Sequence, residues 1–163
     1  MTRIKIFWVM ARLYFGLLFL WAFLDKMFGL GFATVAGKTW LDGVSPTYGF
    51  LKFGAHGPFA EVFSSLAGNM VVDWFFMLGL LGIGLAMTLG AGVKIAGVSG
   101  ALLVLYMYIA LIPPVNHPFL DEHILYAIVF LGLAFVAEEP GSTFGIGKCW
   151  KKCKLVQQHK WLE

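Results

Sequence analysis

A short polar run, Asn116–His123, holds two histidines, two acids and an amide directly before an apolar stretch. Charged and imidazole side chains are costly at the edge of a bilayer, and they usually persist there for capping, pairing or chemistry. His123 lies at helical spacing from the Tyr126 phenol, as Glu122 does, so the imidazole could relay a proton to or from a membrane-dissolved substrate. We therefore take His123 and Asp121 as candidate catalytic residues.

Helix-start physics offers a second interpretation of the same run. Pro118 suits the first turn of a helix, because its missing N–H has no helical partner there. Asn116 or His117 can cap such a helix, and the two acids that follow complement the helix dipole. Capping explains the amide, the proline and one acid. It does not explain His123, which lies deeper in the expected helix.

Asp25 and Lys26 form a second polar group, at the end of the first apolar stretch. Lys26 could pair with Asp121 or Glu122, which would lower the cost of each charge. Asp25 could in the same way pair with His123. Either contact would assemble one polar pocket at one face of the molecule. The alternative is a lysine that snorkels to the interface beside an acid that ends the span.

A metal or haem site is not expected. His117 and His123 are six residues apart, which is not a helical ligand spacing, and no H-E-x-x-H pattern occurs. None of the four histidines lies in the middle of an apolar stretch, where axial haem ligands would be needed. The acids and histidines that could offer metal ligands are Asp25, His56, Glu61, Asp73, His117, Asp121, Glu122 and His123.

The composition points to lipid as the solvent of this 163-residue chain, which is 60% hydrophobic and 13% charged. Soluble domains carry about 25% charged residues. Four apolar stretches, at about 7–28, 71–91, 93–112 and 119–137, are each close to the roughly 20 residues that a helix needs to cross a bilayer. None alternates as a strand would, and helices are the default in lipid. We expect an all-α membrane protein, a four-transmembrane-helix bundle over residues 1–139, with a basic tail at 140–163; a soluble helical bundle is the alternative.

The basic residues divide unequally between the two sides of such a bundle. The positive-inside rule then places both termini in the cytoplasm of a plasma membrane. Because the basic residues flank apolar spans, nucleic-acid binding is not expected. The first stretch is too long for a signal core and lacks a cleavage site, so we expect an uncleaved span. The side richer in basic residues carries Arg3, Lys5, Arg12, Lys94, Lys148, Lys151, Lys152, Lys154 and Lys160, and the other carries Lys26, Lys38 and Lys52.

The long outer loop between the first and second spans, 29–70, is too aromatic for a solvated linker. We expect it to lie on the membrane surface or to fold back over the bundle, with short helices near 34–41 and 58–67. A plain interfacial belt of aromatic residues is the alternative.

Small residues recur every four positions on the second and third spans, which favours close helix contact in lipid. We expect a tight antiparallel hairpin there, ended by Pro113-Pro114. The two stripes are Gly82, Ala86 and Gly90, then Gly92, Ala96 and Gly100.

Cys149 and Cys153 are spaced C-x-x-x-C in the basic tail. That spacing differs from the C-x-x-C redox motif. A tail lying near anionic lipid is the simplest interpretation, with S-acylation or a redox role as alternatives.

Three segments, Phe19–Phe28, Ser45–Phe50 and Asn116–Ala127, resemble the DoxX/DoxD family of small four-helix membrane proteins. That family includes the small subunit of thiosulfate:quinone oxidoreductase. The resemblance covers most of residues 10–137, and it ends before the tail. Here His117 stands between the asparagine and the proline of the family's Asn-Pro-Phe form.

The resemblance implies a quinone-linked oxidoreductase subunit in a bacterial or archaeal plasma membrane, with thiosulfate or a related sulfur donor. The chain carries no recognisable haem, flavin or iron–sulfur motif, so we expect a partner redox subunit; a homo-oligomer is also open. Alternatives are a non-enzymatic scaffold or assembly factor and, third, a small-solute transporter. The expected catalytic residues are His123, Asp121 and Asp25, and the expected quinone-binding residues are Lys26, Trp21, Trp40, Asn116, Glu122 and Tyr126.

Overall fold

The computed structural model describes residues 3–136 and 146–159, and within them it is helical, with no strand. Three helices are long and apolar enough to cross a membrane: α1 (Arg3–Phe28), α3 (Met70–Leu89) and α4 (Val93–Ala110). A fourth apolar helix, α5 (Glu122–Val136), is shorter. The all-helical expectation is confirmed, while the expected end of the fourth span at residue 137 lies outside the described residues. The remaining helices are short: η1 (Phe50–Gly54), η2 (Gly57–Phe59), α2 (Ala60–Ser65), α6 (Gly147–Trp150) and α7 (Lys154–Gln158).

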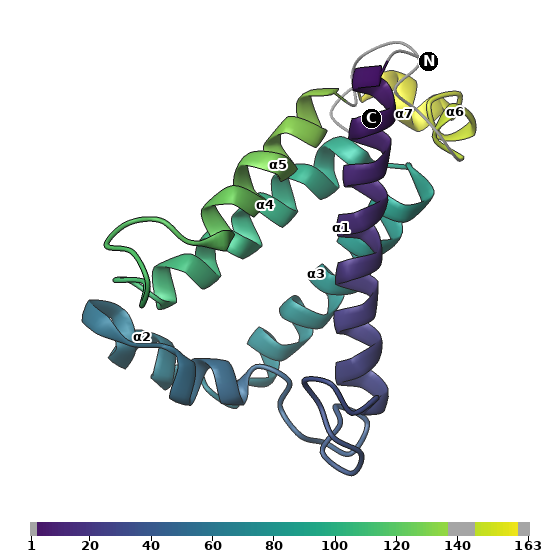
Figure 1. Ribbon diagram of the computed structural model, residues 1–163. Helices are drawn as coiled ribbons and strands as arrows, with labels where there is room; N and C mark the ends of the chain where they lie inside the picture. The colour runs from purple at the N-terminus through teal and green to yellow at the C-terminus, as the bar shows by residue number, and fades with distance from the viewer. Residues whose placement is uncertain (1–2, 137–145, 160–163) are drawn as a thin grey trace.

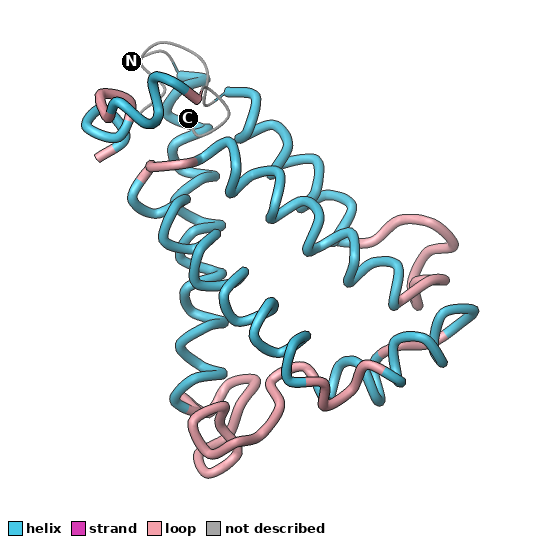
Figure 2. The backbone as a smooth tube through the Cα atoms, turned by 180° about the vertical axis from the view of Figure 1, so that it is seen from behind, coloured by secondary structure: helices cyan, strands magenta, loops and turns pink. Residues whose placement is uncertain are grey.

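The four long helices form two pairs, α1 with α3 and α4 with α5 (Figure 1). Both views show α3 and α4 diverging from the turn that joins them (Figure 2). At the far end, the segment with η1, η2 and α2 runs across the space between the pairs, and η2 contacts α4. We call this the loop end, and the opposite end, where α3 meets α4, the turn end.

Glycines set the close contacts within each pair. A Cβ on Gly84 of α3 would lie 2.9 Å from the backbone nitrogen of Leu20 in α1. A Cβ on Gly97 of α4 would lie 2.6 Å from the carbonyl oxygen of Phe130 in α5. Gly82 has open space around it. The expected hairpin is present, but the small residues bring α3 to α1 and α4 to α5 rather than α3 to α4.

Aromatic side chains join the two pairs near the middle of α1. Phe130 of α5 is fully buried, and its ring lies 4.7 Å from that of Phe15 and 5.2 Å from that of Phe19, centroid to centroid. Buried methionines of α3, Met77 and Met87, belong to the same core. This core limits how far the pairs can diverge, because Phe15 and Phe19 belong to one helix pair and Phe130 belongs to the other.

The loop and the tail differ in part from expectation. Residues 34–41 form turns and bends without a helix, whereas η2 and α2 occupy 57–65 as expected. Asn69 caps α3, since its side chain accepts a hydrogen bond from the Val71 amide at 2.9 Å. At the turn end, the Ile146 amide donates to the Leu89 carbonyl at 3.1 Å, which ties the start of the described tail to α3.

Candidate functional site

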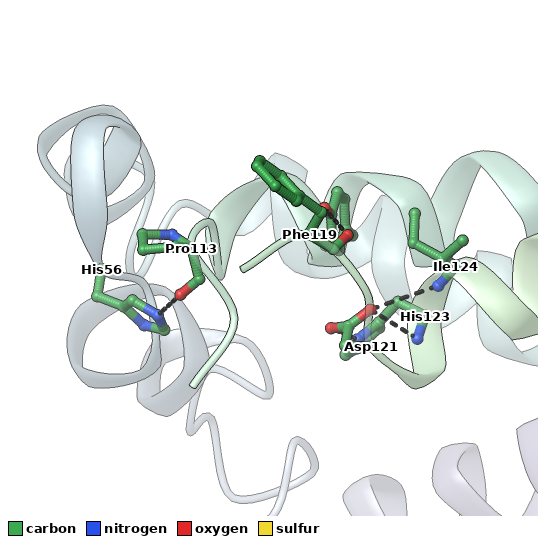
Figure 3. A network of polar contacts seen from close by, with 7 residues as sticks. His56, Pro113, Phe119, Asp121, His123 and Ile124 are labelled. Atoms are coloured by element: carbon green, nitrogen blue, oxygen red, sulfur yellow. Dashed lines mark hydrogen bonds and ion pairs between the residues drawn. The ribbon is translucent and has the colours of Figure 1, made fainter. Parts of the chain in front are cut away.

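The start of α5 is built around Asp121. Its Oδ1 accepts hydrogen bonds from the amides of His123 at 3.0 Å and Ile124 at 3.4 Å (Figure 3). Asp121 is therefore the cap of α5, in the manner typical of helix starts. The helix begins at Glu122, so Pro118 lies before it and not in its first turn. His117 caps nothing in α5: its Nδ1 accepts from the amides of Phe119 and Leu120 in the preceding turn.

The structure brings Asp121 and His123 together. Asp121 Oδ2 lies 2.8 Å from His123 Nδ1, and the two side chains are 11% and 12% exposed. This contact orients the ring and favours a proton on Nδ1, which leaves Nε2 available. Tyr126 points elsewhere: its ring packs edge-on against Phe15 at 5.3 Å, and its hydroxyl makes no hydrogen bond within the described residues. The expected phenol-to-imidazole relay is not assembled.

Asn116 and Glu122 line a small hollow of about 200 Å³ together with Asp121 and His56. Asp121, Glu122 and His123 also offer ligand atoms within 4.8 Å of one another. One carboxylate of this group is already used to cap α5 and to hold the His123 ring. The geometry therefore assigns Asp121 and His123 a structural role at the start of α5.

His56, a minor candidate in the sequence, connects the loop to the end of α4. Its Nδ1 lies 2.9 Å from the Gly54 carbonyl and its Nε2 3.0 Å from the Pro113 carbonyl (Figure 3). Both partners are acceptors, so both nitrogens donate only when the ring is protonated. Hydrogen bonds to these two carbonyls raise the pKa of His56 above its ordinary value. Next to it, a Cβ on Gly57 would overlap the Ile112 carbonyl oxygen.

Asp25 is buried and organises the loop that follows α1. Its carboxylate accepts hydrogen bonds from the amides of Phe32 at 3.3 Å and Ala33 at 2.9 Å. No contact joins it to His123 in the part of the chain that the structure describes. The expected Asp25 to His123 pair is therefore not formed, and Asp25 has a structural role at the loop end.

Lys26 lines a different cavity from the α5 acids. We call it the α3–α4 pocket; it encloses about 560 Å³ between the diverging helices, with η1 at one side. Within residues 3–136 and 146–159, Lys26 forms no ion pair with Asp121 or Glu122, so the shared pocket expected from the sequence is not assembled. The other lining residues are Pro46, Thr47, Phe50, Leu51, Val71, Val72, Phe75, Phe76, Leu102, Leu103, Tyr106 and Met107.

The Lys26 ammonium is the cationic group of this apolar pocket. Its Nζ lies 5.9 Å from the centre of the Phe76 ring, a cation–π distance. It forms no hydrogen bond within the described residues. Asp25 acts on it electrostatically, but that carboxylate is bound to loop amides. The ammonium is thus positioned to donate to an oxygen of a ligand in the pocket.

The two tryptophans expected beside Lys26 lie outside the α3–α4 pocket. Trp21 is 45% exposed and packs edge-on against Phe32 at 5.1 Å. Trp40 pairs with Trp74 at 4.7 Å and lines another cavity. Aromatic walls are instead supplied by Phe75, Phe76 and Tyr106, which sequence reasoning missed because they lie within apolar spans. The one sequence signal for these three residues is a concentration of aromatic residues near the loop end of α3 and α4.

Comparison with protein-family models, with curated proteins and with solved structures found no match.

Proposed function

We propose that this chain is the quinone-binding subunit of a membrane oxidoreductase, with the quinone ring in the α3–α4 pocket. The observation that carries the proposal is Lys26, a lysine without a protein hydrogen-bond acceptor in the described residues, in a pocket with mostly apolar walls. Ligand pockets combine such walls with a few placed polar groups, in volumes of roughly 300–1,000 Å³. An ammonium donating to a ring carbonyl would orient the ring, and Phe75 and Tyr106 would contact its faces or tail.

The proposal includes a four-span topology in a bacterial or archaeal plasma membrane, with both termini cytoplasmic and the loop end outside. In that arrangement the pocket lies in the outer half of the bilayer, where a quinone headgroup can reside. Electrons would come from a partner redox subunit, with thiosulfate or a related sulfur compound as donor. Lys26 would stabilise negative charge developing on the quinone oxygen as it is reduced.

Binding of decylubiquinone to the purified chain tests the proposal. In Lys26→Met we expect the dissociation constant to rise about 10- to 100-fold, because a hydrogen bond to a charged group contributes roughly 1.5–3 kcal/mol. The matched control is Lys38→Met, which removes an exposed lysine of the loop outside the pocket. Equal affinity in wild type and Lys26→Met, at unchanged melting temperature, would refute a quinone site at Lys26.

A membrane scaffold is the second candidate, and one observation favours it. The acids of the loop end are engaged in structural hydrogen bonds: Asp25 with loop amides, Asp73 with loop hydroxyls and Asp121 with the start of α5. If scaffolding is the whole role, Asp25→Asn lowers the melting temperature while no variant of Lys26 changes quinone binding. A quinone-binding wild type that loses affinity in Lys26→Met excludes this interpretation.

A further inference from the structure

A second cavity at the loop end carries a charge opposite to that of the α3–α4 pocket. It encloses about 470 Å³ beside the end of α1 and the start of α3. Its walls include Trp40, Trp74 and two methionines, Met27 and Met70, and its acid is Asp73. Where Lys26 gives the first pocket a positive charge, Asp73 gives this one a negative charge.

The aromatic wall is a tryptophan pair. The rings of Trp40 and Trp74 lie 4.7 Å apart, centroid to centroid, at an interplanar angle of 75°. In such an edge-on pair the edge of one indole meets the face of the other, which leaves further ring faces open. Indole faces attract cations more strongly than any other side-chain ring. Trp74 is half exposed, so its ring remains accessible from the cavity side.

Asp73 is a buried carboxylate with one oxygen satisfied. It is 5% exposed, and its Oδ1 accepts hydrogen bonds from the hydroxyls of Ser45 at 2.8 Å and Thr47 at 2.6 Å. Oδ2 has no partner within residues 3–136 and 146–159, yet it is not among the fully enclosed polar atoms. It therefore reaches the cavity. Burial of a carboxylate is costly unless a cation or further donors compensate.

The chain's own neighbouring lysine does not supply that cation. Lys26 precedes Met27 directly, but its ammonium lies over Phe76 and lines the other pocket. Lys38, the next basic residue along the loop, is exposed and lies outside the wall of this cavity. The negative charge at Asp73 thus faces a cavity that no basic side chain of the described residues enters.

We propose that this cavity binds an organic ammonium ion, with Asp73 as counter-charge and the Trp40–Trp74 pair as the cation–π surface. Two sources offer that chemistry: the ethanolamine or choline headgroup of a lipid, and a free small amine. The site is independent of the quinone proposal, because it shares no lining residue with the α3–α4 pocket. Ser45 and Thr47 act as positioning residues, since their hydroxyls donate to Oδ1 of Asp73. Ser45 also lines this cavity, whereas Thr47 lines the α3–α4 pocket.

Saturation-transfer NMR on the full chain in dodecyl maltoside, a detergent with neither charge nor amine, tests the proposal. The probes are methylammonium and tetramethylammonium. We expect at least one to bind saturably and its dissociation constant to rise at least tenfold in Asp73→Asn, which keeps acceptors for Ser45 and Thr47. Glu61→Gln, which removes an exposed acid of α2, is the matched control and should bind like wild type.

Trp74→Leu provides a second variant if Asp73→Asn fails to fold, because Trp74 is half exposed and tolerates truncation better. It should also weaken binding at least tenfold. The proposal is overturned if neither probe binds saturably, or if both variants bind the probe like wild type. Added phosphatidylethanolamine then identifies the source of the ligand. If this lipid competes with the probe, the ligand is a lipid headgroup, and if it does not compete, the ligand is a free amine. Phosphatidylglycerol should not compete in either case.

Discussion

At the scale of single residues, His56 shows how one side chain connects two distant segments. Its ring spans from the Gly54 carbonyl, at the end of η1, to the Pro113 carbonyl, after α4. Its amide also donates to the Ala110 carbonyl at 3.0 Å. A neutral imidazole can donate from one nitrogen only, so deprotonation leaves a nitrogen lone pair facing a carbonyl. The contact is therefore complete only in the acid form.

The raised pKa of His56 predicts a pH-dependent stability. Its pKa is raised by folding, so the stabilisation is fully present below the unfolded value of about 6.5 and is lost as pH rises through the folded pKa. We expect the melting temperature of wild type to exceed that of His56→Gln at about pH 5.5 and the difference to shrink by about pH 8.5. Thermal unfolding in detergent across this range measures it. A difference that stays constant with pH would contradict a protonated His56.

Neighbouring residues can have unrelated roles, as Asp25 and Lys26 show. The sequence predicted that at least one of them lines a pocket at the loop end. Side chains one position apart on a helix point about 100° from each other. Asp25 consequently meets the loop amides, while Lys26 reaches the α3–α4 pocket. Which of the two would meet the loop depends on the path of residues 29–45, and no local pattern in the sequence fixes that path.

At the scale of helices, glycine positions decide which pairs are close. Gly97→Ala should lower stability by roughly 1–2 kcal/mol, because the new methyl group meets the Phe130 backbone and overpacking outweighs the gain in helix propensity. Gly82→Ala, with open space around it, should be neutral or slightly stabilising. Thermal unfolding of both variants compares them directly. Equal effects at the two glycines would contradict the described α4–α5 contact.

The same glycines mark what sequence spacing can predict. The four apolar stretches correctly located the long helices. Repeats of small residues predicted a close contact between α3 and α4, whereas the closest glycine contacts join α3 to α1 and α4 to α5. The spacing of small residues could not predict which helix packs on each stripe. Every helix face in lipid meets apolar surface, so the sequence pattern does not distinguish one neighbour from another. Gly84 and Gly97, which meet backbone atoms of another helix, lie outside the stripes that the four-residue spacing selected, whereas Gly100 of the second stripe meets the Phe130 ring of α5. The start of α5 was also misplaced, because Pro118 offered an equally good start to a local rule.

At the scale of the whole molecule, the number of membrane crossings rests on α5. Its 15 described residues span about 22 Å, against roughly 30 Å of hydrocarbon. The tail supports a full crossing: Ile146 is bonded to Leu89 at the turn end, opposite the loop end where α5 begins. Cys149 and Cys153 are free and exposed. In the proposed topology, with four spans and cytoplasmic termini, their thiols would face the cytoplasm.

Labelling with a membrane-impermeant maleimide tests this topology. In intact cells we expect no labelling of the native thiols, Cys149 and Cys153, until the membrane is permeabilised. Asn116→Cys, in a chain where both native cysteines are serine, should label without permeabilisation because Asn116 is exposed near the loop end. Labelling of both the native thiols and Asn116→Cys in intact cells would indicate three crossings, whereas labelling of the native thiols alone would indicate four crossings in the inverted orientation.

The divergence of α3 from α4 also determines which ligand concentration governs the occupancy of the α3–α4 pocket. Phe75 on one wall and Leu102 on the other are 74% and 63% exposed, on helices that are long and apolar enough to cross a membrane. A ligand would therefore arrive sideways, from within the bilayer, having already left water. Its effective abundance is its mole fraction among the lipids. Doubling the lipid at fixed protein and ligand should dilute it twofold, although the volume of the sample has not changed.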